Sequence, residues 1–359
     1  MNVTENERVN AFVHRRREMR YLWILFLFFL LIITVILSDF IGSVRIPILN
    51  LLEIYGSQIP FLSNFIPHGY TLAQEQIIVQ LREPEILGGV VIGASLGIGG
   101  AAIQSIFRNP ITEPYIIGLS SGASLGAVSS IVLGLTIFGI YTQQITAFVF
   151  GLSIVFIVYF FALRGGKVHP TYLLLTGVAV SFFVSAIVAL LLFTNINLQG
   201  EAFFWLLGSL EDINWTLLFP VAIVVLITSY VIYLQHRELD AIQMGDMHAR
   251  AVGVNVERTK RVTIFMVALS VSAAVSISGL IGFVGLVMPH LSRMLLGGSN
   301  KHVIPASGIL GAIFLICADD IARGIVPGVV VPIGIVTGII GVPFLMYFMR
   351  KLTGGRYEG

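Results

Sequence analysis

Charged residues are scarce in this chain. Aspartate, glutamate, lysine and arginine make up 11% of its 359 residues and 56% are hydrophobic, whereas soluble domains carry about 25% charged residues. This low share excludes a water-soluble globule and indicates a protein that lies in a lipid bilayer. The net charge of +2 gives no sign of nucleic-acid binding. The single cysteine leaves no pair for an internal disulfide.

Motifs for covalent chemistry are also missing. The sequence holds no G-x-x-x-x-G-K-[ST] loop, which would cradle nucleotide phosphates. It shows no Ser/His/Asp arrangement, no H-E-x-x-H motif and no cysteine-rich ligand set. We therefore expect no catalytic residue, no metal site and no cofactor on this chain, and we expect ATP and Mg²⁺ to be bound by a partner.

Ten apolar runs divide the chain. A membrane-spanning helix needs about 20 mostly apolar residues, and such runs lie near residues 21–41, 86–106, 115–140, 144–163, 171–193, 216–234, 262–282, 284–296, 304–322 and 333–349. They predict an all-α, polytopic membrane bundle of about ten transmembrane helices. Residues 1–359 are expected to form a single domain with an N-terminal tail at 1–20.

Glycine is dense in the second apolar run. Gly88, Gly89, Gly93, Gly97 and Gly100 lie at small-xxx-small spacings, which let neighbouring helices approach closely. Glycine is also commoner in membrane helices than in soluble ones. The density of this run favours a tightly packed core.

Lysine and arginine are distributed unevenly between the two sides of the predicted bundle. With ten spans, all but three of the 21 fall on the side of the N-terminus, and short loops rich in these residues stay in the cytoplasm. Both termini are therefore expected in the cytoplasm of a multi-pass protein of the cell membrane. The three exceptions are Arg45, Arg82 and Arg323.

Few ionisable residues lie within the apolar runs. The main ones are Glu113, His290, Arg293, Asp319 and Asp320, and most sit near the ends of runs. A proton-coupled transporter is expected to hold a carboxylate or histidine relay near the middle of the membrane, and none is evident. The two aspartates lie within one helical turn of a following arginine, which favours a salt-bridge or hydrogen-bond network.

The most charged interior stretch is the expected contact for a soluble partner. This coupling segment covers residues 239–256, and helix-compatible residues run from 239 to 252, where Gly253 can end the helix. Such a helix would present Met244, Met247 and Ala251 as an apolar ridge. A solvated loop with some helical character is the alternative on these residues alone.

Several long motifs follow one another between residues 81 and 351. They read LREPEILGGVVIGASLGIGGAAIQSIFRNPITEPYIIGLSSGA (81–123), MGDMHARAVGV (244–254), GLIGFVGLVMPHLSRMLLG (279–297), ADDIAR (318–323) and PIGIVTGIIGVPFLMYFMRK (332–351). With these motifs the chain resembles the FecCD-type permeases, the membrane subunits of ABC importers for iron chelates, haem and cobalamin.

The resemblance implies a homodimer with its passage on the two-fold axis, two ATPase subunits and an extracytoplasmic substrate-binding protein. The residues it implies for ATPase coupling are Met244, Gly245, Asp246, Ala249, Arg250 and Gly253. Those implied for docking of the binding protein are Arg82 and Arg323. Those implied for the passage and its outer gate are Gln104, Asn109, Ser120, Ser121, Asn195, Asn197 and Gln199.

The chain departs from the family pattern on the expected docking surface. The second arginine of the family's LR-x-PR motif is replaced by Glu85, and residues 327–332 lack an acidic residue that the family carries there. The docking surface is therefore expected at the same location but with altered pairings.

Two local features allow alternative interpretations. Asn109-Pro110 and Glu113-Pro114 break a helix, and the serines at 120, 121 and 124 either satisfy the freed backbone groups or face a polar passage. Residues 203–205 form either a short gating helix or an interfacial aromatic anchor.

Two other protein classes compete with the importer. One is a secondary transporter or channel driven by an ion gradient. The other, which is weaker, is a membrane receptor that transports nothing. The motifs do not separate cobalamin, haem, a ferric siderophore and a molybdate-type oxyanion as the cargo.

Overall fold

The chain folds into an almost wholly helical bundle. The computed structural model describes residues 3–42, 44, 46–59, 61, 67, 69–325 and 330–354, so Arg45 and residues 327–329 lie outside the described part. The helices of the ten apolar runs are α1 (Val3–Ser38), α4 (Glu83–Phe107), α5 (Leu119–Val132), α6 (Thr142–Ala162), α7 (Pro170–Thr194), α9 (Trp215–Leu234), α12 (Val256–Ser278), α13 (Val284–Leu296), α14 (Asn300–Ile325) and α15 (Ile333–Gly354). Within the described ranges, seven helical stretches are long and apolar enough to cross a membrane, and three shorter apolar helices lie in α5, α13 and α15. The prediction of an all-α membrane bundle is confirmed.

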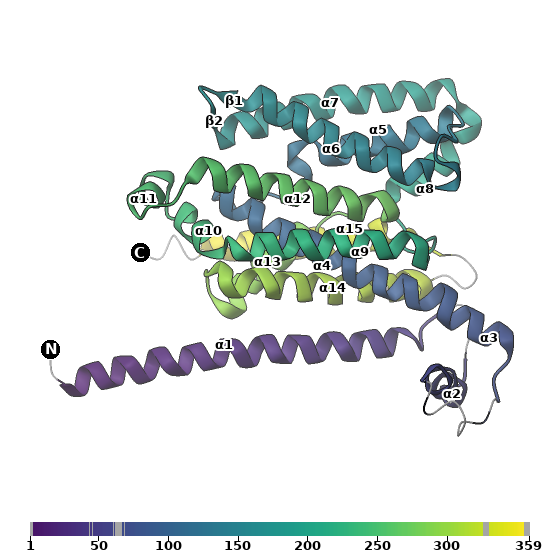
Figure 1. Ribbon diagram of the computed structural model, residues 1–359, viewed down its shortest axis with the longest axis horizontal. Coiled ribbons are helices and arrows are strands. Elements are labelled where there is room, and N and C mark those ends of the chain that lie inside the picture. The colour runs from purple at the N-terminus through teal and green to yellow at the C-terminus, as the bar shows by residue number, and fades with distance from the viewer. Residues whose placement is uncertain are drawn as a thin grey trace.

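Short elements join the long helices. They are α2 (Ile48–Gln58), α3 (Leu72–Gln76), α8 (Gln199–Leu207), α10 (His236–Gln243), α11 (Asp246–Ala251) and the antiparallel hairpin of β1 (Leu163–Arg164) and β2 (Lys167–Val168). Figure 1 shows α10, α11, the hairpin, the start of α1 and the end of α15 at one end of the bundle, which we call the coupling end. The short helices α2, α3 and α8 lie toward the opposite end.

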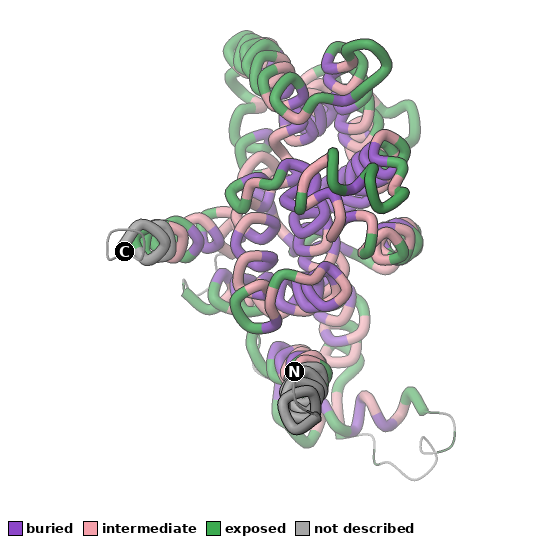
Figure 2. The backbone as a smooth tube through the Cα atoms, turned by 90° about the vertical axis from the view of Figure 1, so that its left-hand side faces the viewer, coloured by how far each residue is buried: buried purple, intermediate pink, exposed green. Residues whose placement is uncertain are grey.

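The helices form layers around α4. In Figure 1, α5, α6 and α7 make one layer, α9 and α12 lie beside it, and α1 runs alone along the other side. Helix α12 contacts both α6 and α4, and α14 joins α4 to α1. Figure 2 shows the buried residues gathered in the centre of the bundle, whereas α15 projects from one side.

Glycine allows the closest helix crossings of α4. A Cβ atom at Gly93 or Gly97 would overlap backbone atoms of Gly311 or Ser307 on α14, and one at Gly100 would overlap the carbonyl group of Gly285 on α13. Small residues permit such backbone contact between membrane helices. The predicted packing role of this glycine run is confirmed.

The helical path is interrupted between α4 and α5, as the two proline pairs predict. Arg108 ends α4 in the left-handed region (φ 53°), a 3-10 turn covers Pro114–Ile117, and Gly118 has φ 87° before α5 begins. A second break lies between α12 and α13, and the Tyr115 hydroxyl donates to the Ile281 carbonyl there (3.0 Å). The two breaks therefore pack against each other inside the bundle.

Several predicted boundaries were wrong. The run at 115–140 is an α-helix only at Leu119–Val132. The second run begins as a helix at Leu72, well before residue 86, because Thr71 and Gln74 form a capping box and a π-helical turn at Ile77–Arg82 continues into α4. The coupling segment is not one helix from 239 to 252. It consists of α10 and α11, since Gly245 takes φ 122° between them.

Candidate functional site

Two large apolar side chains project from the coupling end. Met244 is 74% exposed at the end of α10 and Met247 is 84% exposed on α11. Ala251, at the end of α11, is exposed as well. The predicted apolar ridge is therefore present, although it belongs to two short helices.

Gly245 and Ala249 shape the segment from within. The φ of 122° at Gly245 suits glycine, because a Cβ would be strained there. Ala249 is fully buried against Ile242 and Val256. These two predicted coupling residues thus fix the corner between α10 and α11 and leave the surface to the methionines.

Arg250 and Gly253 complete the second short helix. Gly253 has φ 86° and its N–H donates to the carbonyl of Arg250 (3.1 Å), which ends α11. The Arg250 guanidinium forms an ion pair with Glu257 at the start of α12 (3.0 Å). Arg250 thereby attaches α11 to α12, whereas Gly253 ends α11.

Asp246 lies between two basic side chains. Its Oδ2 accepts from Lys260 Nζ at 2.6 Å, and its Oδ1 lies 3.5 Å from Arg108 Nη2. The Lys260 side chain is 0% exposed and that of Asp246 is 29% exposed. One carboxylate therefore joins α11, α12 and the end of α4.

A polar network continues from the coupling segment into the bundle. Gln243 Nε2 donates to Ser105 Oγ on α4 (3.2 Å), which in turn donates to Asn300 Oδ1 at the start of α14 (3.0 Å). Asp240 accepts from the Asn300 backbone N–H (2.7 Å). The sequence motifs do not identify Ser105, Asp240, Asn300 or Lys260, and only their position near the ends of apolar runs signals them.

Arg82, at the opposite end, is buried. The side chain lies in the bundle with the residue only 5% exposed. Its Nη1 donates to the Asp39 carbonyl (2.7 Å), and its Nη2 donates to the Val44 carbonyl. Arg82 thus ties the chain after α1 to the start of α4.

Arg323 is held by three carboxylates. Its Nη2 lies 2.8 Å from both Asp319 and Asp320, and its Nη1 lies 3.5 Å from Glu85. The predicted network of the two aspartates with this arginine is confirmed. Glu85, which departs from the family motif, is part of the same cluster, so both predicted docking arginines already have partners within the chain.

Asp39 lies beside this cluster, just after α1. Its Oδ2 accepts from the Tyr55 hydroxyl on α2 (2.9 Å). Burial raises the pKa of Asp39, although the hydrogen bond from Tyr55 and the charge of Arg82 act in the opposite direction. The ionised carboxylate therefore carries a desolvation cost in the folded chain.

The predicted passage residues on α4 and α5 serve backbone groups. Gln104 is buried and donates to the Leu286 carbonyl on α13 (3.1 Å). Asn109 Oδ1 accepts from a backbone N–H in the break (3.1 Å). Ser121 Oγ donates to the Gly118 carbonyl (2.9 Å), while Ser120 is half-buried. Gln104, Asn109 and Ser121 therefore each bond to a backbone group.

The predicted gate residues surround the junction of α7 and α8. Asn195 and Gln199 donate to carbonyls in the last turn of α7, each at 3.0 Å, and Asn197 is exposed. Residues 203–205 lie on α8, so the predicted short helix is present, with Phe203 and Phe204 exposed.

Comparison with known proteins points to one transport family. The model of the FecCD transport family matches residues 30–351. The chain is 38% identical to the cobalamin import system permease protein BtuC of Halobacterium salinarum, over 77% of this chain and 74% of that protein. It is 34% identical to the hemin transport system permease protein HmuU of Yersinia pestis, over 78% and 84%.

A solved structure shares the fold. It is an ABC transporter assigned to the metal-chelate type, in an inward-facing conformation. The TM-score is 0.78 at 30% sequence identity, and the match covers 91% of this chain and 98% of the other.

Proposed function

The chain belongs to the FecCD transport family, and we propose that two copies of it enclose the passage of an ABC importer along their two-fold axis. It is a multi-pass membrane permease. The gate residues around α7 and α8 support the dimer, because Asn197, Phe203 and Phe204 are exposed in the single chain. A second copy would enclose them.

The ridge of Met244 and Met247 is the proposed contact for the ATPase subunits. Both side chains are exposed, and burying a methionine contributes about 1.5–3 kcal/mol. ATP and Mg²⁺ would bind to the ATPase, so this chain would perform no hydrolysis and hold no cofactor. The exposed methionines are the single observation that carries this assignment.

The polar network beneath the ridge would pass movement into the bundle. Asp246 contacts α12 and the end of α4, and Gln243 contacts Ser105 on α4. A displacement of α10 and α11 on ATP binding would therefore move helices that reach the opposite end, as in shear-type domain motions.

The coupling end is proposed to face the cytoplasm. Most lysines and arginines lie in the loops assigned to that side, as the positive-inside rule expects. The opposite end would then receive the substrate-binding protein around Arg82 and Arg323. Because both arginines already have partners within the chain, docking would involve the surface that they hold in place.

The proposed cargo is a metal chelate such as cobalamin, haem or a ferric siderophore. The named relatives are permeases of a cobalamin import system and of a hemin transport system, and the similar structure is assigned to the metal-chelate type. The cargo would move along the dimer axis without covalent change.

Paired substitutions in the ridge test the proposed ATPase contact. The Met244→Glu/Met247→Glu variant is expected to lose at least about a hundredfold in affinity for the ATPase, because two buried apolar contacts are replaced by charges. The matched Met244→Leu/Met247→Leu variant keeps the apolar surface and should bind normally. Wild-type affinity in the glutamate variant would contradict the assignment.

A further inference from the structure

A narrow groove runs between α6 and α12 in the half of the bundle nearer the coupling end. Its volume is about 360 Å³, and its lining includes Leu152, Phe156 and Tyr159 on α6. Across from them α12 contributes Arg261, Phe265 and Ala268. Both sets follow the i, i+4, i+7 spacing of one helix face, so two apolar stripes form the walls.

The groove covers about two-thirds of the depth of one membrane leaflet. From Tyr159 to Leu152 the helix rises about 10 Å, against about 15 Å for half of a hydrocarbon core. Both helices are spans. Phe156 is 52% exposed and Phe265 is 37% exposed, with ring centroids 5.7 Å apart. This surface faces the space where lipid chains lie.

The mouth of the groove is basic. Arg261 lines it and is exposed, and in the described part of the chain no carboxylate forms an ion pair with it. Arg258 lies one turn earlier on α12, also exposed. Lys167, on the exposed part of the hairpin, lies near the start of α12. Its neighbour on β2, Val168, places it there, because the Val168 N–H donates to Glu257 Oε2 (3.1 Å). That carboxylate is itself paired with an arginine.

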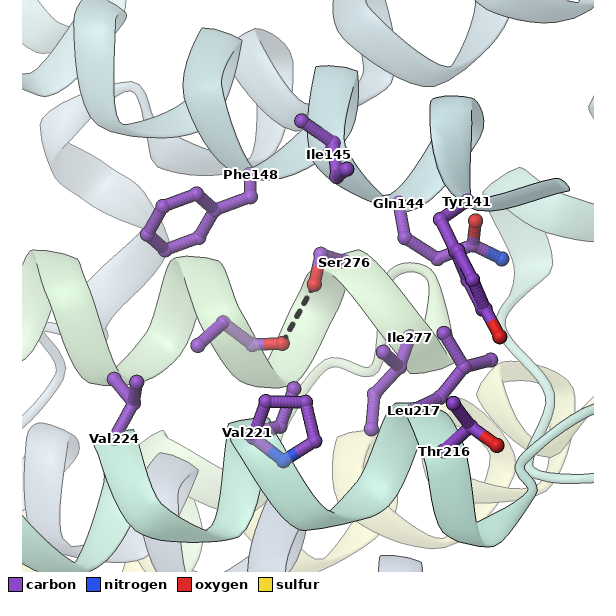
Figure 3. A pocket seen from close by; sticks show the side chains of 12 residues that line it. Tyr141, Gln144, Ile145, Phe148, Thr216, Leu217, Val221, Val224, Ser276 and Ile277 are labelled. Carbon is purple, nitrogen blue, oxygen red and sulfur yellow. Dashed lines mark hydrogen bonds between the residues drawn. The ribbon is translucent and has the colours of Figure 1, made fainter. Parts of the chain in front are cut away.

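A second groove shows what the basic mouth adds. Figure 3 shows it in the other half of the bundle, where Tyr141, just before α6, and Gln144 and Phe148 on α6 lie opposite Val221 and Val224 on α9. Its volume is about 350 Å³. Its lining contains no lysine or arginine. The two grooves are therefore similar in size and apolar character but differ in charge.

We propose that the groove between α6 and α12 binds one anionic phospholipid, with an acyl chain along the apolar lining and the phosphate on Arg261. The apolar lining can hold the part of an acyl chain that lies nearer the headgroup. The unpaired guanidinium at the mouth fits a phosphate, with which arginine forms charge-assisted hydrogen bonds. The site is independent of the transported cargo.

Native mass spectrometry of the purified full-length chain tests the proposal. The chain is incubated with an equimolar mixture of phosphatidylglycerol and phosphatidylcholine that carry the same acyl chains. Wild type should retain phosphatidylglycerol preferentially. Arg261→Gln should reduce that preference about fivefold, which is the effect of one basic residue at an anionic lipid surface, and Arg261→Lys should largely keep it.

Three further variants separate the contribution of the acyl chain from that of the headgroup. Leu152→Trp places a large ring in the apolar part of the groove, so it should lower retention of both lipids. Val224→Trp in the other groove and Arg237→Gln, an exposed arginine on α10, should leave the preference unchanged. The proposal is overturned if wild type shows no preference, or if Arg237→Gln reduces it as much as Arg261→Gln does.

Discussion

Removing the carboxylate of Asp246 should destabilise the chain more than removing the amine of Lys260. The two atoms are 2.6 Å apart, and the lysine side chain is 0% exposed. The Asp246→Ala variant leaves a buried ammonium without its partner, which costs about 3–5 kcal/mol. Since the aspartate side chain is 29% exposed, water reaches the site, and we expect about 3 kcal/mol.

The reverse change is milder. Lys260→Met replaces the buried charge by an apolar side chain of similar length, and Asp246 keeps Arg108 at 3.5 Å and contact with solvent. We expect a loss of about 1 kcal/mol or less, as for exposed ion pairs. The double variant should therefore recover most of the loss caused by Asp246→Ala.

The assay is unfolding of the purified chain in detergent, followed for wild type, both single variants and the double variant. Thermal midpoints and denaturant midpoints should rank them in the same order. Equal losses for the two single variants, or a double variant as unstable as Asp246→Ala, would refute the view that a buried, unpaired lysine is the source of the cost.

Three further changes have defined outcomes. Gly97→Ala should cost about 1–3 kcal/mol, because its Cβ overlaps a carbonyl group of α14, whereas Gly200→Ala, with open space around it, should be neutral or stabilising in the same unfolding assay. Glu85→Arg restores the family's residue type, yet it should lower the unfolding midpoint, since Arg323 exchanges a carboxylate for a like charge. Asp39→Asn should raise stability at pH 7, because burial raises the pKa of Asp39 and makes its ionised form unfavourable in the folded state. That gain should vanish in unfolding measured below pH 3.8, the ordinary pKa of the side chain.

The long helices and their packing followed from the sequence because hydropathy and glycine spacing are local signals. Gly93, Gly97 and Gly100 predicted close crossings, and each faces the backbone of another helix. The motifs likewise located the coupling segment and the break before α5. These features depend on composition over short windows, which a single sequence contains in full.

Tertiary contacts decided what the sequence left open. Gly245 is compatible with a helix in the sequence, but it takes a φ of 122° between α10 and α11, where Ala249 is fully buried. Arg82 and Arg323 read as surface residues, but each has a partner distant in sequence: the Asp39 carbonyl bonds Arg82, and the Glu85 carboxylate pairs with Arg323. In the sequence Lys260 belongs to a charged stretch that is typical of an exposed loop, but its side chain is fully buried.

The most direct test of the account is transport by proteoliposomes that contain the chain, its ATPase and its binding protein. The account predicts that cobalamin or hemin uptake requires ATP and the ATPase, and that Met244→Glu/Met247→Glu abolishes uptake while the leucine variant retains it. Uptake that proceeds without the ATPase and follows a proton or sodium gradient would contradict the account.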